Sequence, residues 1–356
     1  MTKIKTLSFA GETIYCGIDV HKENWRVNIR TSERELEDYS QNADVDCFIE
    51  HVRRRYPYAK VKVAYEAGFC GFYACRKMIL AGIDCIVVNA ADVPSSDKDK
   101  KQKNDTVDAR KLSRELSKTN LRALYVPCIK EQNDRSLVRL REQMVQNQTR
   151  SKNRIRHLLH FNGLKVAEGV DKEKYWTKAF IKALQELDCG DESLRMTLNL
   201  MLLELTEIRK RVLESTRLVR KLAETKDYSS NVELVRSIPG IGPVNAMVIL
   251  TELGDIKRFA TFDHLCSYVG FTPSTDDSGD RKKDRGITHR CNNRLRTALI
   301  ESCWMLISKD PAMLMKYSGY CRKMNKNQAI IRIGKHLLSR IKCVLTKREK
   351  YETCLV

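Results

Sequence analysis

The sequence predicts an α/β domain followed by an all-α remainder of the chain, and two observations lead to this division. Up to about residue 125, short apolar runs alternate with segments of helical periodicity, an order that fits a mixed sheet with helices on its faces. Beyond that point, leucine, isoleucine and valine recur at three- and four-residue spacing over long stretches. We therefore predict a sheet domain at residues 1–125, a helical and coiled-coil linker or oligomerisation region at 126–230, and a mainly helical domain at 231–356.

The predicted elements of the first domain follow from β-leaning apolar runs, helical spacing and glycine breaks. In chain order we expect strands at Thr13–Ile18, Trp25–Ile29 and Leu36–Ser40, a helix at Val45–Arg54, a strand at Val61–Tyr65, a helix at Phe72–Ala81, a strand at Ile83–Val88, a lysine-rich loop at Asp92–Lys103 and a helix at Thr106–Ser117. This order is also that of a ribonuclease-H-like (RuvC-like) fold.

Four carboxylates lie where such a sheet domain would use them. Asp19 terminates the first strand and Glu66 the fourth, while Asp105 and Asp108 lie three residues apart at a helix start and so share one helix face. Carboxylates brought together repel one another unless divalent cations bind, and oxygen ligands suit Mg²⁺ or Mn²⁺. We interpret the four as a metal site for phosphodiester cleavage. Taken singly, Asp105 could cap its helix and Asp19 could be a turn residue.

The charge balance indicates a polyanionic partner. The chain has 65 Lys+Arg against 45 Asp+Glu, a net charge of +20, which favours nucleic acid or an acidic membrane surface over an ordinary basic enzyme. No run of 18 apolar residues appears, and the polar stretch Met1–Ala10 argues against a secretory signal, so we expect no membrane span and no membrane partner. The 13 cysteines form no CxxC pair, which argues against disulfides and zinc. We expect a bacterial cytosolic protein associated with the nucleoid.

Two long helical stretches occupy the middle of the chain. Arg135–Gly163 is strongly basic, and Arg154 and Arg156 are candidates for nucleic-acid backbone contact, although a solvated charged helix is the simpler alternative. Met196–Glu224 carries apolar residues at helical spacing and predicts either an antiparallel hairpin partner or a coiled coil. We favour oligomerisation through this stretch.

The third region begins with the segment Val235–Gly254, which has the pattern of a helix-hairpin-helix. Gly240 and Gly242 lie between two apolar helices, where glycines allow a tight turn and expose N–H groups to a phosphate. Such a motif binds DNA without reading its sequence. The alternative is a plain turn between two helices.

A candidate nucleophile follows the helix predicted at Phe262–Gly270. Ser278 lies in a polar loop, Ser274–Asp280, directly before the basic segment Arg281–Arg296, whose arginines would stabilise a phosphorane-like transition state. Ser274, Thr275 and Thr288 compete for the same role, and a solvated loop serine is the default. The basic residues expected to contact nucleic acid here are Arg281, Lys282, Lys283, Arg285 and Arg290.

Segments spread over nearly the full length are similar to the DEDD transposases of the insertion sequence family one hundred and ten, the bridge-RNA-guided recombinases. They are YCGIDVHKENW, VAYEAGFCGFYACRKM, KNDTVDARKL, SIPGIGPVNA, LCSYVGFTPSTDDSG and GITHRCNNRLRTALIE. The resemblance implies that Asp19, Glu66, Asp105 and Asp108 bind Mg²⁺ and that Ser278 is the nucleophile. This chain departs from the family's usual Ser-Lys-x-Gly-Asn at residues 288–292, where it lacks the glycine.

The resemblance also implies the partners and the reaction. A dimer or tetramer would hold element DNA, target DNA and a structured bridge RNA, and would exchange strands through a covalent phosphoserine intermediate in a transposase domain at 231–356. The alternatives are a junction-resolvase-type endonuclease that hydrolyses DNA with the same four carboxylates, and a non-catalytic nucleic-acid binder. The complete set of carboxylates argues against a non-catalytic binder, and the long third region argues against a bare resolvase.

Overall fold

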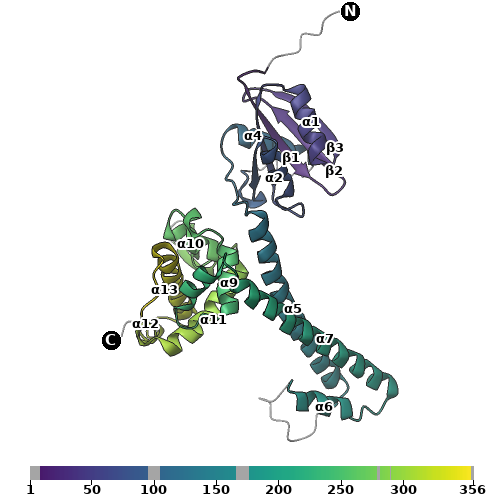
Figure 1. The fold of residues 1–356 in the computed structure, drawn as a ribbon, viewed down its shortest axis with the longest axis vertical. Helices are drawn as coiled ribbons and strands as arrows, with labels where there is room; N and C mark the ends of the chain where they lie inside the picture. The colour runs from purple at the N-terminus through teal and green to yellow at the C-terminus, as the bar shows by residue number, and fades with distance from the viewer. Residues whose placement is uncertain (1–8, 95–104, 166–175, 279–280, 289, 354–356) are drawn as a thin grey trace, which may run out of the picture. The chain divides into compact units, whose positions relative to one another are not determined.

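The computed structural model describes residues 9–94, 105–165, 176–278, 281–288 and 290–353, with only the backbone described at 105–106 and 273–287. The chain divides into two compact units, Met1–Val126 and Pro127–Val356, and each is described by itself (Figure 1). Over the described residues, no helix combines the length and apolar character that a membrane crossing would require.

A five-stranded mixed sheet forms the first unit. Its strand order is β3-β2-β1-β4-β5, with β1, β2 and β3 antiparallel and β4 and β5 parallel to β1. The strands are β1 (Thr13–Val20), β2 (Asn24–Arg30), β3 (Glu35–Asn42), β4 (Lys60–Glu66) and β5 (Asp84–Val88); the helices are α1 (Val45–Arg55), α2 (Tyr73–Leu80), a 3₁₀ turn η1 (Ala90–Asp92) and α4 (Asp105–Ser117). The predicted mixed sheet is confirmed, with each strand and helix within a few residues of its expected bounds; most of the loop expected at Asp92–Lys103 lies outside the described residues.

Alternation along β1 assigns the two faces of this sheet, because successive strand residues point to opposite sides. The buried side chains of Cys16 and Ile18 join the core formed with α1 and α2. Gly17 lies between them and faces α4, whose Leu112 packs in a smaller cluster with Val88. Helices therefore cover both faces of the central strand.

A long antiparallel pair of helices dominates the start of the second unit. α5 (Ile129–Phe161) and α7 (Glu192–Ala223) run antiparallel, as the side-chain contacts Arg141–Thr216 and Arg154–Glu204 show, and the short α6 (Lys178–Glu186) packs at their far end (Figure 1). The stretch Met196–Glu224 is thus a hairpin partner of α5 within the chain. Its other face leaves Leu200 and Leu203 more than 60% exposed, so self-association through it stays a prediction.

The remaining helices share one apolar core with α9 (Pro243–Leu253), whose residues are mostly apolar and buried. They are α8 (Ser229–Arg236), the 3₁₀ turn η3 (Ile256–Arg258), α10 (Phe262–Val269), α11 (Asn293–Lys309), α12 (Pro311–Cys321) and α13 (Lys326–Lys347). Val138 of α5 and Val219 of α7 belong to the same core. The prediction of a mainly helical second part is confirmed.

The prediction of a polar loop at Ser274–Asp280 is wrong. The chain instead forms two antiparallel strands, β6 (Pro273–Ser278) and β7 (Arg281–Ile287), in which Ser278 pairs with Arg281. Both strands are polar and carry no apolar alternation, so periodicity gave no sign of them. The two residues between them in sequence are Gly-Asp, a pair typical of short hairpin connections, and this was the available signal.

Substitution of Gly17 tests the packing of α4 on β1. A methyl group at this position would clash with the carbonyl oxygen of Ala109 and the amide nitrogen of Ser113. We expect Gly17→Ala to lower the free energy of unfolding of the first unit by about 1–3 kcal/mol. Urea denaturation followed by the fluorescence of buried Trp25, in a Trp176→Phe, Trp304→Phe background, measures this change. Gly68→Ala is the matched control, because open space surrounds Gly68; equal effects of both substitutions would contradict the close approach of α4.

Candidate active site

Two carboxylates end neighbouring parallel strands. Ile18 of β1 pairs with Tyr65 of β4, and Asp19 and Glu66 are the next residues on their strands. The carboxyl ends of parallel strands meet at one edge of a sheet, so these two acids lie side by side there. Both side chains are partly buried. Asp19 also accepts a hydrogen bond from Nε2 of His21 at 3.1 Å.

α4 brings its amino-terminal end to the same edge of the sheet. It crosses β1 at Gly17, two residues before Asp19, where Ala109 lies in direct contact. Asp108 immediately precedes Ala109, and Asp105 is the first residue of the helix. The carboxyl-terminal end of α4 lies at the opposite edge, where Leu116 lines a small cavity with Lys62 and Asp84 at the starts of β4 and β5.

Polar contacts fix the position of α4 on the sheet. Ser113 Oγ donates to Oδ1 of buried Asn28 on β2 at 2.5 Å. Arg110 binds Glu35 through Nε at 2.8 Å and Asp38 through Nη2 at 2.8 Å, both on β3. The sequence analysis did not predict these contacts. Gly17 in β1 and Asn28 in β2 were the available signs that a helix packs closely on these strands.

The donor chemistry of this edge suits a hard divalent cation. Asp19, Glu66 and Asp108 offer carboxylate oxygens, which Mg²⁺ and Mn²⁺ prefer. Within the described part of the chain, no three acidic, histidine or cysteine side chains already converge as a metal site. The side chain of Asp105, the fourth predicted ligand, lies outside the described residues. The structure thus brings Asp19, Glu66 and the start of α4 to one edge without closing a metal site there.

The segment predicted to be a DNA-binding hairpin forms the turn between α8 and α9. Gly240 has a φ of 93°, and a methyl group on it would lie 2.7 Å from the carbonyl oxygen of Ser302 on α11. Packing against α11 therefore accounts for this glycine. Gly242 is the exposed N-cap of α9 with open space around it, and Pro243 begins the helix. Of the two glycines, only Gly242 lies where a phosphate could approach the helix N-terminus.

The strands that carry Ser278 are held at their base. Gly270, with a φ of 83°, ends α10 so close to Cys291 that a methyl group would clash with it. Thr288 accepts hydrogen bonds from the amide of Arg290 at 3.2 Å and, through its carbonyl, from Arg296 at 3.0 Å. These contacts lie in and beside the segment 288–292, where the chain lacks the family's glycine. The side chains of Ser278, Arg281, Lys282, Lys283 and Arg285 lie outside the described residues.

Comparison with known proteins identifies the family of this chain. Residues 232–318 match the family model described as "Transposase IS116/IS110/IS902 family", and residues 16–162 match the DEDD transposase model of the same family. The chain belongs to this family of transposases. The chain is also 26% identical over 256 residues to the transposase of insertion sequence element IS1111A from Coxiella burnetii, covering 71% of this chain and 69% of that one. The transposase of IS1533 from Leptospira borgpetersenii is 25% identical over 303 residues, which cover 82% of this chain and 84% of that one.

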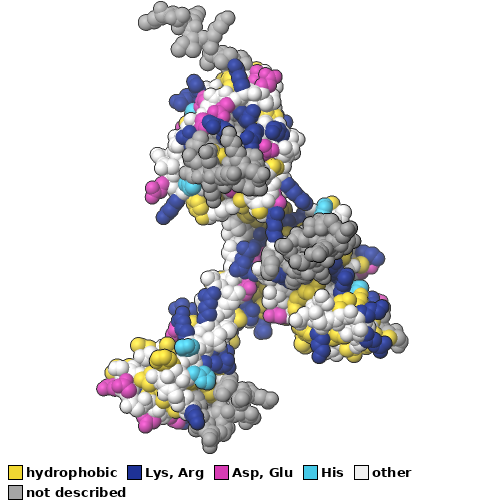
Figure 2. Space-filling view, turned by 180° about the vertical axis from the view of Figure 1, so that it is seen from behind, with side chains coloured by type: hydrophobic (Ala, Val, Ile, Leu, Met, Phe, Trp, Pro, Cys, Tyr) yellow, Lys and Arg dark blue, Asp and Glu magenta, His cyan; other side chains and the backbone are white. Residues whose placement is uncertain are grey.

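The candidate arginines of α5 have partners within the transposase. Arg154 contacts Glu204 on α7 at 3.5 Å, and Arg156 lies 5.7 Å from the ring centre of Trp176, as Lys152 does at 5.8 Å. Arg154 remains 61% exposed. Lysine and arginine side chains are spread over the surfaces of both units on the face shown in Figure 2. Nucleic-acid contact by Arg154 and Arg156 therefore stays a prediction.

Substitutions at Gly240 and Gly242 test packing and the predicted DNA contact separately. We expect Gly240→Ala to destabilise the second unit by about 2–4 kcal/mol, because the left-handed φ and the contact with α11 both oppose a side chain. Gly242→Ala should leave the melting temperature unchanged and weaken DNA binding, since its methyl group would enter the space in front of the α9 amides. Thermal unfolding and DNA titration measure the two effects. Full DNA affinity in Gly242→Ala would contradict a hairpin that binds DNA.

Proposed function

We propose that this transposase cuts and rejoins DNA through a phosphoserine intermediate, with Asp19, Glu66, Asp105 and Asp108 holding Mg²⁺ or Mn²⁺ and Ser278 as nucleophile. As an insertion-sequence transposase, it acts on element DNA and target DNA. The observation that carries the proposal is the placement of Asp19, Glu66 and the start of α4 at one edge of the sheet. The family assignment and the position of Ser278 next to a basic strand add support.

The carboxylates act as metal ligands that rigid strands and a helix hold in place. A divalent cation at this edge would supply Lewis-acid stabilisation of the charge that develops on the scissile phosphate. Asp19 and Glu66 are fixed by the β-ladder, and Asp108 by the packing of its helix on Gly17. Ligands on rigid elements keep their geometry during the reaction, which is what phosphoryl transfer requires.

Ser278 would carry the covalent step. Its Oγ attacks the phosphorus and loses its proton, while the bond between phosphorus and a DNA sugar oxygen breaks and that oxygen takes up a proton. A hydroxyl of the second DNA then attacks the phosphoserine, which forms the new phosphodiester and returns the proton to Ser278. No water is consumed, so the number of phosphodiester bonds is conserved. The positive charge of Arg281, Lys282, Lys283 and Arg285 would stabilise the phosphorane-like transition state.

The remaining partners follow from charge and from the need for two DNAs. A net charge of +20 suits a protein that holds several polyanions, and we propose that a structured bridge RNA supplies sequence specificity by pairing. We further propose a dimer or tetramer, with Ser278 of one subunit acting at the carboxylates of another, associated with the nucleoid. The second candidate function is hydrolytic cleavage of DNA junctions, which the same carboxylate edge would support without Ser278.

Loss of the covalent adduct tests this proposal. The transposase is mixed with its element's flanking RNA, labelled element-end and target DNA and Mg²⁺, then denatured, and DNA that migrates with protein is measured. We expect Ser278→Ala to reduce the adduct to background, since loss of a nucleophile typically costs about 10⁶-fold. Asp19→Asn should do the same without weakening DNA binding.

Two other outcomes would contradict the assignment. Cleavage without an adduct, undiminished in Ser278→Ala, would leave the hydrolytic function. An adduct that survives Ser278→Ala but disappears in Ser274→Ala or Thr275→Ala would move the nucleophile along the same strand.

A further inference from the structure

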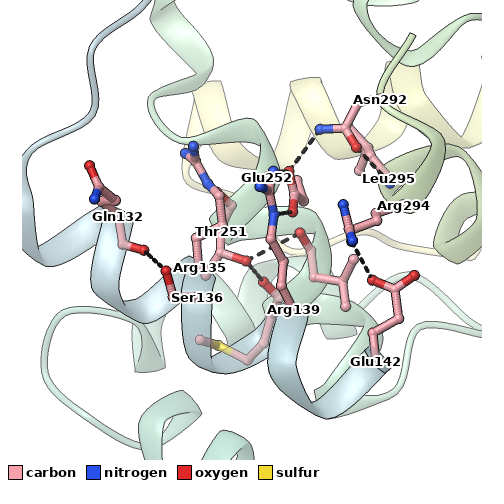
Figure 3. A network of polar contacts seen from close by, with 12 residues as sticks. Gln132, Arg135, Ser136, Arg139, Glu142, Thr251, Glu252, Asn292, Arg294 and Leu295 are labelled. Atoms are coloured by element: carbon pink, nitrogen blue, oxygen red, sulfur yellow. Dashed lines mark hydrogen bonds and ion pairs between the residues drawn. The ribbon is translucent and has the colours of Figure 1, made fainter. Parts of the chain in front are cut away.

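A buried carboxylate, that of Glu252, lies where four helices of the second unit meet. Glu252 belongs to the otherwise apolar α9 and is 1% exposed. Its carboxylate accepts two hydrogen bonds from Arg139 of α5, from Nε at 2.6 Å and from Nη2 at 2.8 Å (Figure 3). A buried charge is costly unless it is paired and fully hydrogen-bonded, so such a group needs a reason to be there.

The second partner of the Glu252 side chain is Asn292, the N-cap residue of α11. Asn292 donates from Nδ2 to the carboxylate of Glu252 at 2.8 Å and to the hydroxyl oxygen of Tyr268 at 3.1 Å. Its Oδ1 accepts the amide of Leu295 at 3.1 Å and so caps α11. Burial alone would raise the pKa of Glu252, but the hydrogen bonds from Arg139 and Asn292 lower it below its ordinary value. The group is therefore ionised at neutral pH.

Both stems of the β6–β7 hairpin connect to this network. In sequence, β7 is followed by Thr288 and then by Asn292. The main-chain N–H of Asn292 donates to the main-chain carbonyl of Tyr268 at 2.9 Å. β6 follows α10, which carries Tyr268, and the hydroxyl of Tyr268 donates to the carbonyl of Glu252 at 2.9 Å. The side chain of Glu252 thus binds Asn292, which follows β7. Its main-chain carbonyl binds Tyr268, which precedes β6.

We propose that Glu252 is a positioning residue, which sets the hairpin that carries Ser278 relative to α5 through Arg139, Asn292 and Tyr268. This inference rests on the proposed role of Ser278. Both oxygens of the Glu252 carboxylate accept from Arg139, and one of them also accepts from Asn292, whereas an amide at this position would direct its NH₂ group at a donor of Arg139 in either orientation. A hairpin held less firmly would bring Ser278 to the phosphate less often, and a misplacement of about 1 Å can cost a catalyst about 10²-fold.

Two variants and one control test the proposal in the full-length chain. Glu252→Gln removes the charge at constant shape. Asn292→Ser keeps an oxygen that can cap α11 and removes the Nδ2 group that donates to Glu252, because the serine side chain is shorter. Glu142→Gln is the control, since it breaks another ion pair between α5 and α11, Glu142 with Nε of Arg294 at 2.8 Å, that does not touch the hairpin stems (Figure 3).

Hydrogen exchange and adduct formation are measured on each variant. In Glu252→Gln and Asn292→Ser we expect faster exchange at residues 271–292, unchanged exchange in α13, unchanged DNA affinity, and adduct formation slowed about 10- to 100-fold. Glu142→Gln should behave like the parent protein in all of these measurements.

Three results would overturn the proposal. Unchanged exchange at 271–292 in both variants would show that the network does not hold the hairpin. Faster exchange with normal adduct formation would show that its position does not limit the reaction. Uniform loss of protection across α9, α11 and α13 would assign Glu252 a general stabilising role. An absent adduct in the parent protein, by contrast, would be a failure of the proposed function and is recognised before any Glu252 variant is compared.

Discussion

The close approach of α4 to β1 is the contact on which the arrangement of the first unit depends. A helix can lie this near a strand only where the strand has no side chain, and Gly17 provides that gap beneath Ala109 and Ser113. Asp19 follows Gly17 by two residues, and Asp108 precedes Ala109 by one. The packing contact therefore also determines where these two carboxylates lie. The same contact that closes one face of the sheet therefore places a helix start beside two strand ends.

In the second unit, a short polar hairpin is attached to a helical body. The large apolar core of this unit is built from α5, α7 and the helices that pack with α9. At the base of β6 and β7 lie Gly270 with its left-handed φ, the cap of α11 and the Glu252 network. The core formed by α9 and its neighbours supplies the rigid support, and α5 extends from it through Arg139.

Local patterns were sufficient for much of the fold. The strand Val61–Tyr65 is an apolar run that ends at a carboxylate, and the helix at Thr106–Ser117 follows a polar, lysine-rich segment, so both elements could be predicted with their acidic residues. The hairpin at 273–287 could not, because polar strands carry no hydrophobic period. The network around Glu252 was also beyond reach, since Arg139 and Glu252 are 113 residues apart. A lone carboxylate in an apolar helix was the only sign of it.

The central claim is that this transposase transfers strands without water, and oxygen isotope labelling tests it most directly. The reaction is run in H₂¹⁸O with element and target DNA, and the phosphates at the recombined junctions and at any unjoined ends are analysed by mass spectrometry. Our account predicts no ¹⁸O at either, because each phosphorus passes from DNA to Ser278 and back to DNA. Incorporation of one ¹⁸O into the phosphate at every cut end would show attack by water and would contradict the phosphoserine mechanism.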